Sequence, residues 1–295
     1  MIRKKIALNL AVITTLLLWF VFAQSTHAVT YSATLENSNW WVRQSPLECK
    51  LSQSIPRLGT AVFQHKAGEE LNFHLETRQD HLKPGVASLE VEGPAWKVNI
   101  IPKLITDVEV APGSVPLAVA YPDSGRMLEH LNRGMMLSFG LYSSADAEPA
   151  EMVKVAISTV NFNSAYQEYL DCMAQLLPVD FLQIARSAIY FNTSKTSLSE
   201  EVEAQLALIA RYIIADDRIR RVVIDGHTDN RGNKNQNREL SKQRTDMVTG
   251  FFKKEGVNSQ LIVSRYHADK YPVLENDSEE NRARNRRVTI RLERE

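Results

Sequence analysis

The sequence predicts two domains: an N-terminal mainly-β barrel or sandwich, and a C-terminal α/β sandwich with the element order β-α-β-α-β-β. The chain has 295 residues, enough for two separate hydrophobic cores. Apolar and polar residues alternate over most of residues 34–162, which is the period of half-buried strands. After Pro178, short apolar runs are separated by stretches of helical spacing, as in layered α/β domains.

The first 28 residues predict a signal peptide. Basic residues at positions 3–5 precede an apolar run over 6–23, and the small residues Thr26 and Ala28 suit the −3 and −1 positions of a cleavage site. The alternative is an uncleaved transmembrane helix, because this run is at the lower limit of spanning length. We expect cleavage after Ala28, export, and no membrane anchor in the mature chain, since no cysteine directly follows the run.

The alternating segments of the N-terminal part are separated by turn signals, such as Lys-Pro-Gly at residues 83–85. Short strands of this kind are typical of barrels and sandwiches. Two helices are expected to interrupt them. One runs from Ser124, as N-cap, to Gly134, and the other runs from Ser164 to Leu177 and is stopped by Pro178.

The chain has two cysteines, Cys49 and Cys172. An even number in an oxidising compartment predicts one disulfide, and the alternative is two separately buried thiols. The bond would attach the second helix to the β domain. The sequence therefore predicts an N-terminal domain of residues 29–178 and a C-terminal domain of residues 179–295.

The C-terminal part predicts two helices between strands. The apolar residues Val202, Leu206, Ile209 and Ile213 share one face of the first helix. The expected elements are a strand at 188–191, a helix opened by a Ser197–Glu200 capping box, a strand at 221–224, a helix from about 237 to 254 ended by Gly256, a strand at 262–263 and a strand at 288–292.

Charge and motif searches exclude several classes of function. Residues 29–180 carry 11 basic and 18 acidic groups (net −7), and residues 181–295 carry 21 and 17 (net +4). Without a dense basic stripe, we expect no nucleic-acid partner. The sequence has no G-x-S-x-G elbow, P-loop, zinc-hydrolase spacing or EF-hand loop, so we expect no catalytic residues, metal or cofactor and no enzymatic activity.

Two blocks of sequence in the C-terminal part are the most informative. Residues 226–232 read Gly-His-Thr-Asp-Asn-Arg-Gly and are followed by Asn237, Leu240-Ser241 and Arg244. Further on, Arg282 is followed by Asn-Arg-Arg-Val at residues 285–288. In this order the blocks resemble the signatures of the OmpA-like peptidoglycan-binding domain. The resemblance covers roughly residues 181–295 and implies that family's α/β fold.

The resemblance implies that Asp229 and Arg244 clasp the diaminopimelate residue of the wall peptide. That residue ends in an ammonium and a carboxylate, so one carboxylate and one guanidinium are a minimal receptor for it. The alternative is that Asp229 caps its own loop and Arg244 is a surface charge paired within the protein. The loop after the first strand also borders the family's pocket. The predicted peptidoglycan-binding residues are Asp229, Arg244, Asn237, Thr228, Arg286, Asn192 and Thr193.

Neighbouring positions give further expectations. Of Arg286 and Arg287, one should pack under the loop and the other should be exposed, although alternation does not say which. His227 is expected to be a structural donor that fixes the turn, because no second ligand has metal spacing to it. Tyr266-His267 departs from the Gly-aromatic pair usual in the family, which implies an altered loop beside the pocket.

The N-terminal part resembles the N-terminal domain of the MotY family of periplasmic flagellar-motor proteins. The segments that carry this resemblance are residues 45–49, 55–63 and 166–172. The resemblance implies a domain that joins a ring around the flagellar basal body with a MotX-like protein. The C-terminal domain would then tie that ring, and with it the stator complex, to peptidoglycan.

We therefore expect a periplasmic protein associated with the basal body, the outer-membrane side and the cell wall. The alternatives are a general OmpA-family envelope tether with another periplasmic or outer-membrane partner, and a wall hydrolase or its activator.

Overall fold

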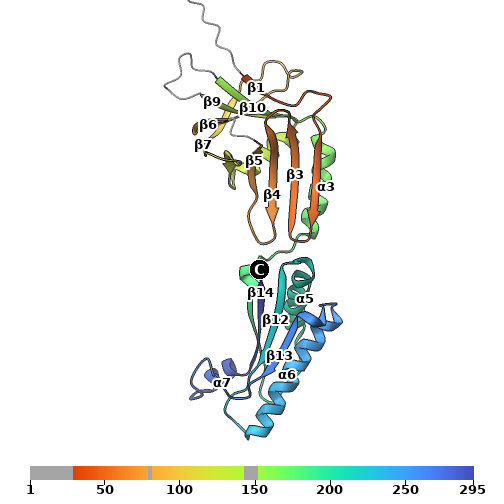
Figure 1. The fold of residues 1–295 in the computed structure, drawn as a ribbon, viewed down its shortest axis with the longest axis vertical. Helices are drawn as coiled ribbons and strands as arrows, with labels where there is room; N and C mark the ends of the chain where they lie inside the picture. Colours follow the sequence, from red (N-terminus) through yellow and green to blue (C-terminus); the bar gives the residue numbers. More distant parts are fainter. Residues whose placement is uncertain (1–28, 79–81, 143–151) are drawn as a thin grey trace, which may run out of the picture. The chain divides into compact units, whose positions relative to one another are not determined.

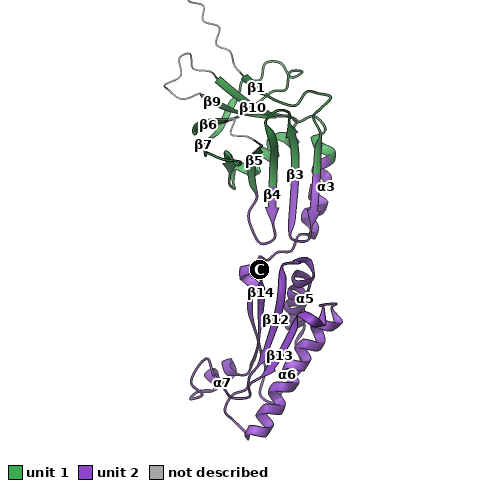
Figure 2. Cartoon of the chain, in the orientation of Figure 1, with its two compact units in different colours: residues 1–41, 52–63, 72–164 green, residues 42–51, 64–71, 165–295 purple. Residues whose placement is uncertain are grey.

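The computed structural model describes residues 29–78, 82–142 and 152–295. The predicted signal peptide lies outside these residues. The chain divides into two compact units, the first formed by residues up to 41, 52–63 and 72–164, and the second by residues 42–51, 64–71 and 165–295 (Figure 2). The second unit thus contains three segments that precede the predicted boundary after Pro178, namely residues 42–51, 64–71 and 165–178.

Most of the N-terminal part is a ten-stranded half-barrel sheet (Figure 1). The strand order is β1-β10-β9-β6-β7-β8-β5-β4-β3-β2, with β1 parallel to β10 and β6 antiparallel to both β7 and β9. The predicted mainly-β class is confirmed. The strands are β1 (Val29–Tyr31), β2 (Trp40–Ser45), β3 (Glu48–Ile55), β4 (Gly59–Lys66), β5 (Asn72–Thr77), β6 (Gly85–Glu92), β7 (Lys103–Val110), β8 (Leu117–Val119), β9 (Met136–Tyr142) and β10 (Met152–Ile157).

Aromatic side chains fill the core of the first unit. The rings of Trp40 and Phe162 meet edge-on, with their centroids 5.0 Å apart. The centroid of the Phe73 ring lies 4.9 Å from that of Phe63 and 5.6 Å from that of Phe139. All four phenylalanines have no exposed surface. This core explains the alternation in the sequence, because one face of each strand contributes to it.

Both predicted N-terminal helices are present with shifted ends. The first, α2, spans Asp123–Asn132, and Pro122 occupies its N-cap without a side-chain cap. The expectation that Ser124 is the N-cap is wrong, since Ser124 lies inside the helix and is fully buried. The second, α3, spans Phe162–Gln175.

Cys49 on β3 and Cys172 on α3 form the predicted disulfide, with their Cα atoms 6.0 Å apart. Both cysteines are buried. The bond links residues 123 positions apart and joins α3 to the start of β3.

The C-terminal part of the second unit has the predicted order β-α-β-α-β-β. Its four strands pair in the order β11-β14-β12-β13, with β12 parallel to β13 and antiparallel to β14. The elements are α4 (Phe181–Ile184), β11 (Arg186–Tyr190), α5 (Glu200–Ala215), β12 (Ile219–Gly226), α6 (Lys234–Lys254), η2 (Ser259–Leu261), β13 (Ile262–Tyr266), α7 (Glu279–Asn285) and β14 (Arg287–Arg294).

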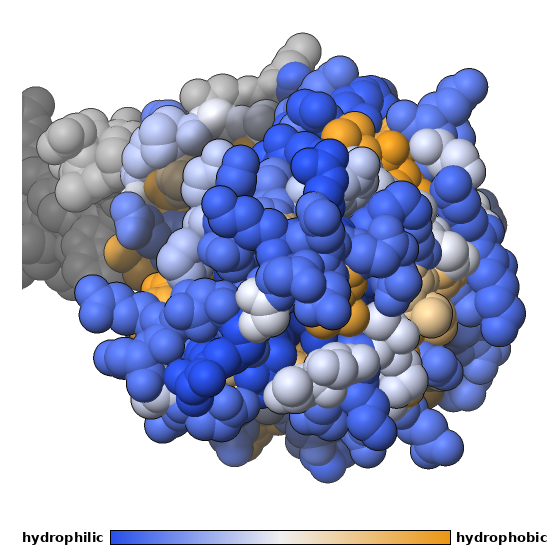
Figure 3. Space-filling view, turned by 90° about the horizontal axis from the view of Figure 1, so that it is seen from below, coloured by the Kyte–Doolittle hydropathy of each residue, from blue (hydrophilic) through white to orange (hydrophobic). Residues whose placement is uncertain are grey.

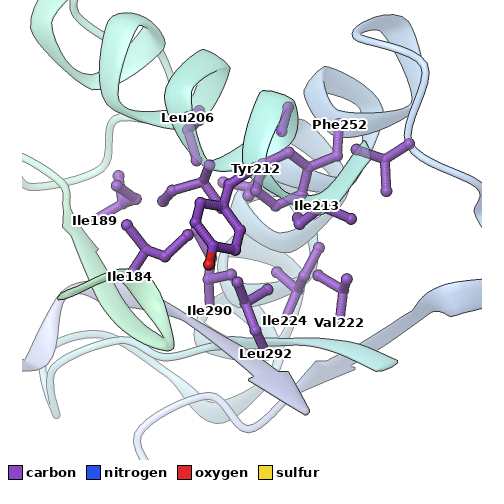
Figure 4. Packing of buried hydrophobic residues seen from close by; sticks show 14 of the residues in the cluster. Ile184, Ile189, Leu206, Tyr212, Ile213, Val222, Ile224, Phe252, Ile290 and Leu292 are labelled. Atoms are coloured by element: carbon purple, nitrogen blue, oxygen red, sulfur yellow. The ribbon is translucent and has the colours of Figure 1, made fainter. Parts of the chain in front are cut away.

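The core of this α/β layer lies between the helices and the sheet (Figure 4). Leu206 and Ile213 from α5 and Phe252 from α6 pack against Ile224 and Ile290 from the strands. Three of the four residues on the predicted face of α5 are buried, and Val202 is half-buried. Burial of this face explains why the helix forms here.

The ends of the two long helices differ from the prediction. Ser199 caps α5 by accepting a hydrogen bond from the amide of Val202, so the predicted Ser197–Glu200 capping box is wrong. Helix α6 begins three residues earlier than the predicted start at residue 237, because Asn233 and Gln236 form a capping box. Among the described helices, none has both the length and the apolar character required to cross a membrane.

Candidate functional site

The residues predicted to bind the wall lie at the end of the second unit where α6 begins. Strand β12 ends at Gly226, where a Cβ atom would overlap the side chain of Thr245 and the carbonyl of Ser241 on α6. Only glycine permits this close approach. The loop that follows is fixed by backbone hydrogen bonds from His227 to the carbonyl of Arg287 and from Thr228 to the carbonyl of Ala268, both 2.8 Å.

Asp229 lies in this loop and is only 6% exposed. Its Oδ1 accepts a hydrogen bond from the amide of Arg231 at 3.1 Å, and its Oδ2 lies 2.9 Å from Nη1 of Arg286. Its backbone carbonyl accepts from the Thr228 hydroxyl at 3.0 Å and from the Asn237 side-chain amide at 3.2 Å. The carboxylate is therefore held in one orientation.

Arg244, on α6, has no exposed surface. Its Nε donates to the carbonyl of Lys195 at 3.0 Å, and its Nη2 donates to the carbonyl of Asn192 at 3.0 Å. The guanidinium also lies over the ring of Phe191, 4.9 Å from the centroid. The loop after β11 thus covers Arg244 with its backbone.

Burial lowers the pKa of Arg244 to about 10, with nearby Arg286 adding to the decrease and Asp229 opposing it. The guanidinium is still charged at neutral pH. Arg244 makes three hydrogen bonds within the described residues, including a 3.4 Å contact from Nη1 to the carbonyl of His227, and two of its five N–H groups remain for another acceptor.

Arg286 and Arg287 are both buried, at 7% and 5% exposure, so the expectation that one is exposed is wrong. Arg286 bridges Asp229 and Glu279, with 2.9 Å to each carboxylate, and its Nε donates to the carbonyl of Phe191. Arg287 lies under the loop and donates to the carbonyl of Tyr271 at 3.1 Å. Burial lowers the pKa of Arg287.

His227 acts as the expected structural donor. Its Nδ1 lies 3.2 Å from the carbonyl of Lys270, an atom that can only accept. Burial, the larger cause, and the charge of Arg287 lower the pKa of His227 to about 4, so the ring is neutral at neutral pH. Within the described residues, no group of three or more histidine, cysteine, aspartate or glutamate side chains is placed to hold a metal ion.

The structure brings six of the seven predicted residues together. Thr228, Asn237 and Arg286 contact Asp229, and Asn192 contacts Arg244 through its backbone. Thr193 is exposed, and within the described part of the chain no hydrogen bond joins it to Asp229 or Arg244.

Sequence reasoning did not single out Glu279 or Asn285 as individual contributors. The side-chain carboxylate of Glu279 binds Arg286. Asn285 is fully buried, and its amide fixes the loop before α7 by accepting from the amide of Val273 and donating to the carbonyl of Leu274. The position of Asn285 in the second sequence block was a usable signal, whereas Glu279 had none.

The arrangement can recognise a ligand that carries both charges. The Asp229 carboxylate can accept hydrogen bonds from an ammonium, and the free N–H groups of Arg244 can bind a carboxylate. A zwitterionic group has no net charge, so it can enter this buried site without adding any.

Comparisons with known proteins match both parts of the chain. Residues 31–178 match the family described as the MotY N-terminal domain, and residues 190–286 match the OmpA family. The sodium-type flagellar protein MotY of Vibrio parahaemolyticus is 28% identical over 268 residues, which cover 89% of each chain. The outer-membrane lipoprotein YfiB of Pseudomonas aeruginosa is 34% identical over 35% of this chain and 61% of its own length. A crystal structure of the C-terminal domain of Helicobacter pylori MotB is similar over 37% of this chain and 85% of that chain, with 24% identity and a TM-score of 0.35.

Proposed function

The chain belongs to the MotY N-terminal domain family, and from this membership we propose that it is a non-enzymatic flagellar-motor protein that binds peptidoglycan. The observation that carries the proposal is the similarity to a flagellar MotY protein along 89% of both chains. The matches to both families along one chain support a role that combines the flagellar motor with wall binding. Its place would be the periplasm, at the basal body and close to the outer membrane and the cell wall.

We assign the flagellar role to residues 29–178 and the wall-binding role to residues 179–295. In the first part, the disulfide between Cys49 and Cys172 supports a rigid domain that can associate with the basal body and a MotX-like partner. In the second part, Asp229 and Arg244 would bind the two ends of the diaminopimelate side chain. Wall attachment would then let the stator complex resist the reaction torque of the motor.

Each charge-assisted contact contributes roughly 1.5–3 kcal/mol, so a single site should bind weakly. A ring of several copies on a repeating wall polymer would bind much more tightly through avidity. Weak individual sites therefore suit an anchor that is present in several copies.

The test is to replace the chromosomal copy in a polarly flagellated host with a fluorescent fusion. We expect a focus at the flagellar pole, and we expect deletion to abolish swimming while filaments still assemble. An even signal around the envelope together with normal swimming would contradict the flagellar role. That outcome would favour a general envelope tether, a role suggested by the 34% identity of the C-terminal part to a lipoprotein.

A second experiment tests the wall site. Purified chain carrying Asp229→Asn should no longer sediment with isolated sacculi, whereas wild-type protein should. Sedimentation of a folded Asp229→Asn variant at the wild-type level would place the wall site elsewhere.

A further inference from the structure

A cavity of about 610 Å³ lies beside the Asp229 loop, between the start of α6 and the loop that follows β13. It is lined by Lys234 and Arg238 from α6 and by Tyr266, Lys270 and Tyr271 from β13 and its loop. The view onto this end of the unit shows a mostly hydrophilic surface with small hydrophobic areas (Figure 3). None of the predicted wall-binding residues lines this cavity.

Three of the side chains that line the cavity are cationic. Within the described residues, no ion pair involves Lys234, Arg238 or Lys270, although Lys242 and Arg265 nearby are each paired with an aspartate. Asp269 is the one acidic residue among those lining the cavity. An excess of two positive charges around one hollow favours an anionic ligand.

Two tyrosines give the cavity an aromatic wall. Tyr266 is 40% exposed and Tyr271 is 69% exposed. The guanidinium of Arg238 lies over the Tyr266 ring, 5.3 Å from its centroid. The His267 ring meets Tyr271 edge-on at 5.5 Å. Partly exposed rings held in this way offer an apolar face with a polar rim, which suits the flat face of a sugar ring.

The loop that carries Tyr271 is held in a strained conformation. Ala268 and Tyr271 have φ angles of 55° and 60°, in the left-handed region that side chains rarely adopt. The surrounding structure maintains this conformation. The Ala268 amide donates to Ser241 Oγ at 3.2 Å, and the carbonyl of Tyr271 accepts from Arg287. Strain that is kept by surrounding contacts is a mark of a functional loop.

Hydrogen bonds join the cavity to the Asp229 site. The amide of Thr228 donates to the carbonyl of Ala268 at 2.8 Å, and Asn237, next to Arg238, donates to the carbonyl of Asp229. A peptide of three extended residues spans about 10 Å. A ligand anchored at Asp229 can therefore extend into the neighbouring cavity.

We propose that this cavity binds the acidic sugar–peptide junction of the same wall strand. This inference rests on the proposed wall binding and adds a second subsite to it. The N-acetylmuramyl ring would stack on Tyr266 and Tyr271. The free carboxylate of the γ-linked glutamate in the stem peptide would be bound by Lys234, Arg238 and Lys270.

The test uses two probes with the full mature chain in titration calorimetry. One probe is the tripeptide L-Ala-γ-D-Glu-diaminopimelate, and the other is the same tripeptide attached to its disaccharide. We expect wild-type protein to bind the disaccharide probe about tenfold more tightly, a difference of roughly 1.4 kcal/mol. Equal wild-type affinities for the two probes would overturn the proposal.

Variants then locate the extra contacts. Tyr266→Ala should abolish the preference, so that the two probes bind with equal affinity, whereas Tyr266→Phe should keep the preference. Arg238→Gln should weaken binding of both probes by a similar factor, since both carry the glutamate carboxylate. Lys253→Gln, at an exposed position in the last turn of α6, is the matched control and should change neither affinity.

Three further outcomes separate this inference from the proposed function. A Tyr266→Ala variant that still prefers the disaccharide probe would overturn the cavity as its site. If Asp229→Asn bound both probes like wild type, the proposed wall site itself would be wrong. Loss of both probes by Asp229→Asn, without any wild-type preference for the disaccharide, would reject the second subsite alone.

Discussion

The guanidinium of Arg286 lies 2.9 Å from the carboxylate of Asp229, and the two side chains are only 8% and 9% exposed. A residue that the sequence suggested as a ligand contact is therefore the internal partner of the residue that was expected to bind the ligand. The pair orders the loop before any ligand arrives. It also makes the site sensitive to losing either charge, because a buried charge without its partner is costly.

Replacing Arg286 by alanine should therefore destabilise the folded chain. We expect the free energy of unfolding to fall by on the order of 3–5 kcal/mol, the usual cost of breaking a buried ion pair. Urea denaturation of the mature chain measures this decrease in the free energy of unfolding. Arg291→Ala removes a half-exposed arginine from a surface pair with Glu293 and should cost less than about 1 kcal/mol. Similar decreases in the free energy of unfolding for both variants would mean that the buried ion pair stabilises the fold no more than a surface pair does.

Replacing Arg244 by lysine should weaken wall binding although the charge is kept. Lysine has no planar fork with which to bind a carboxylate through two parallel hydrogen bonds. Loss of one such contact should lower the affinity for the wall tripeptide about 10- to 150-fold. Calorimetry measures the change. Lys242→Gln, an exposed position on the same helix, serves as the control. A folded Arg244→Lys variant with wild-type affinity would remove Arg244 from the binding site.

Removing the disulfide by Cys49→Ser should destabilise the chain. A bond that closes a loop of 123 positions stabilises by about 4–5 kcal/mol in the chain-entropy model. We expect poor accumulation of the variant in the periplasm. Mass spectrometry of the mature wild-type protein under non-reducing conditions should show no free thiol, and two free thiols would contradict the assignment.

His227 should make stability fall as the solution becomes acidic. Its pKa is about 4 in the folded chain against 6.5 as the ordinary value, so the unfolded chain binds the proton more readily between these pH values. The contribution of neutral His227 to the free energy of unfolding is present above pH 6.5. It is lost progressively as the pH falls towards 4, by up to roughly 3 kcal/mol. Denaturation midpoints of wild type and His227→Gln at pH 7 and pH 4.5 measure the difference. If the midpoint of wild type fell no further between pH 7 and pH 4.5 than that of His227→Gln, this role of His227 would be contradicted.

Periodicity in the sequence predicted the fold class of both parts. Ile224 and Ile290 lie on strands, and Leu206 and Ile213 lie on one helix face, because burial on one side imposes a period on the chain. Caps were harder to predict. Ser197 and Ser199 compete for the start of α5, and side-chain geometry decided in favour of Ser199. Asn233 followed three residues later by Gln236 is a recognisable capping box, and this pattern gives the start of α6 correctly.

The candidate site was predictable only in part. The two sequence blocks predicted that Asp229, Asn237 and Arg286 belong to one site. In the structure, Asn237 and Arg286 both contact Asp229. Alternation could not assign Arg286 and Arg287, since Arg286 precedes β14 and does not follow the period of a strand. The cover over Arg244 was not predictable, because it is made by backbone carbonyls, which every residue has.

That backbone cover has a consequence for how long an attachment lasts. Arg244 has no exposed surface, so we expect that a carboxylate can reach its two remaining N–H groups only when the segment that carries the carbonyls of Asn192 and Lys195 shifts, and that the same segment closes again afterwards. Opening of the loop then limits both the rate of capture and the rate of escape. For an anchor under mechanical load, residence time matters more than equilibrium affinity. Under the proposed function, a slow escape would let each wall contact last longer than a single step of the flagellar motor.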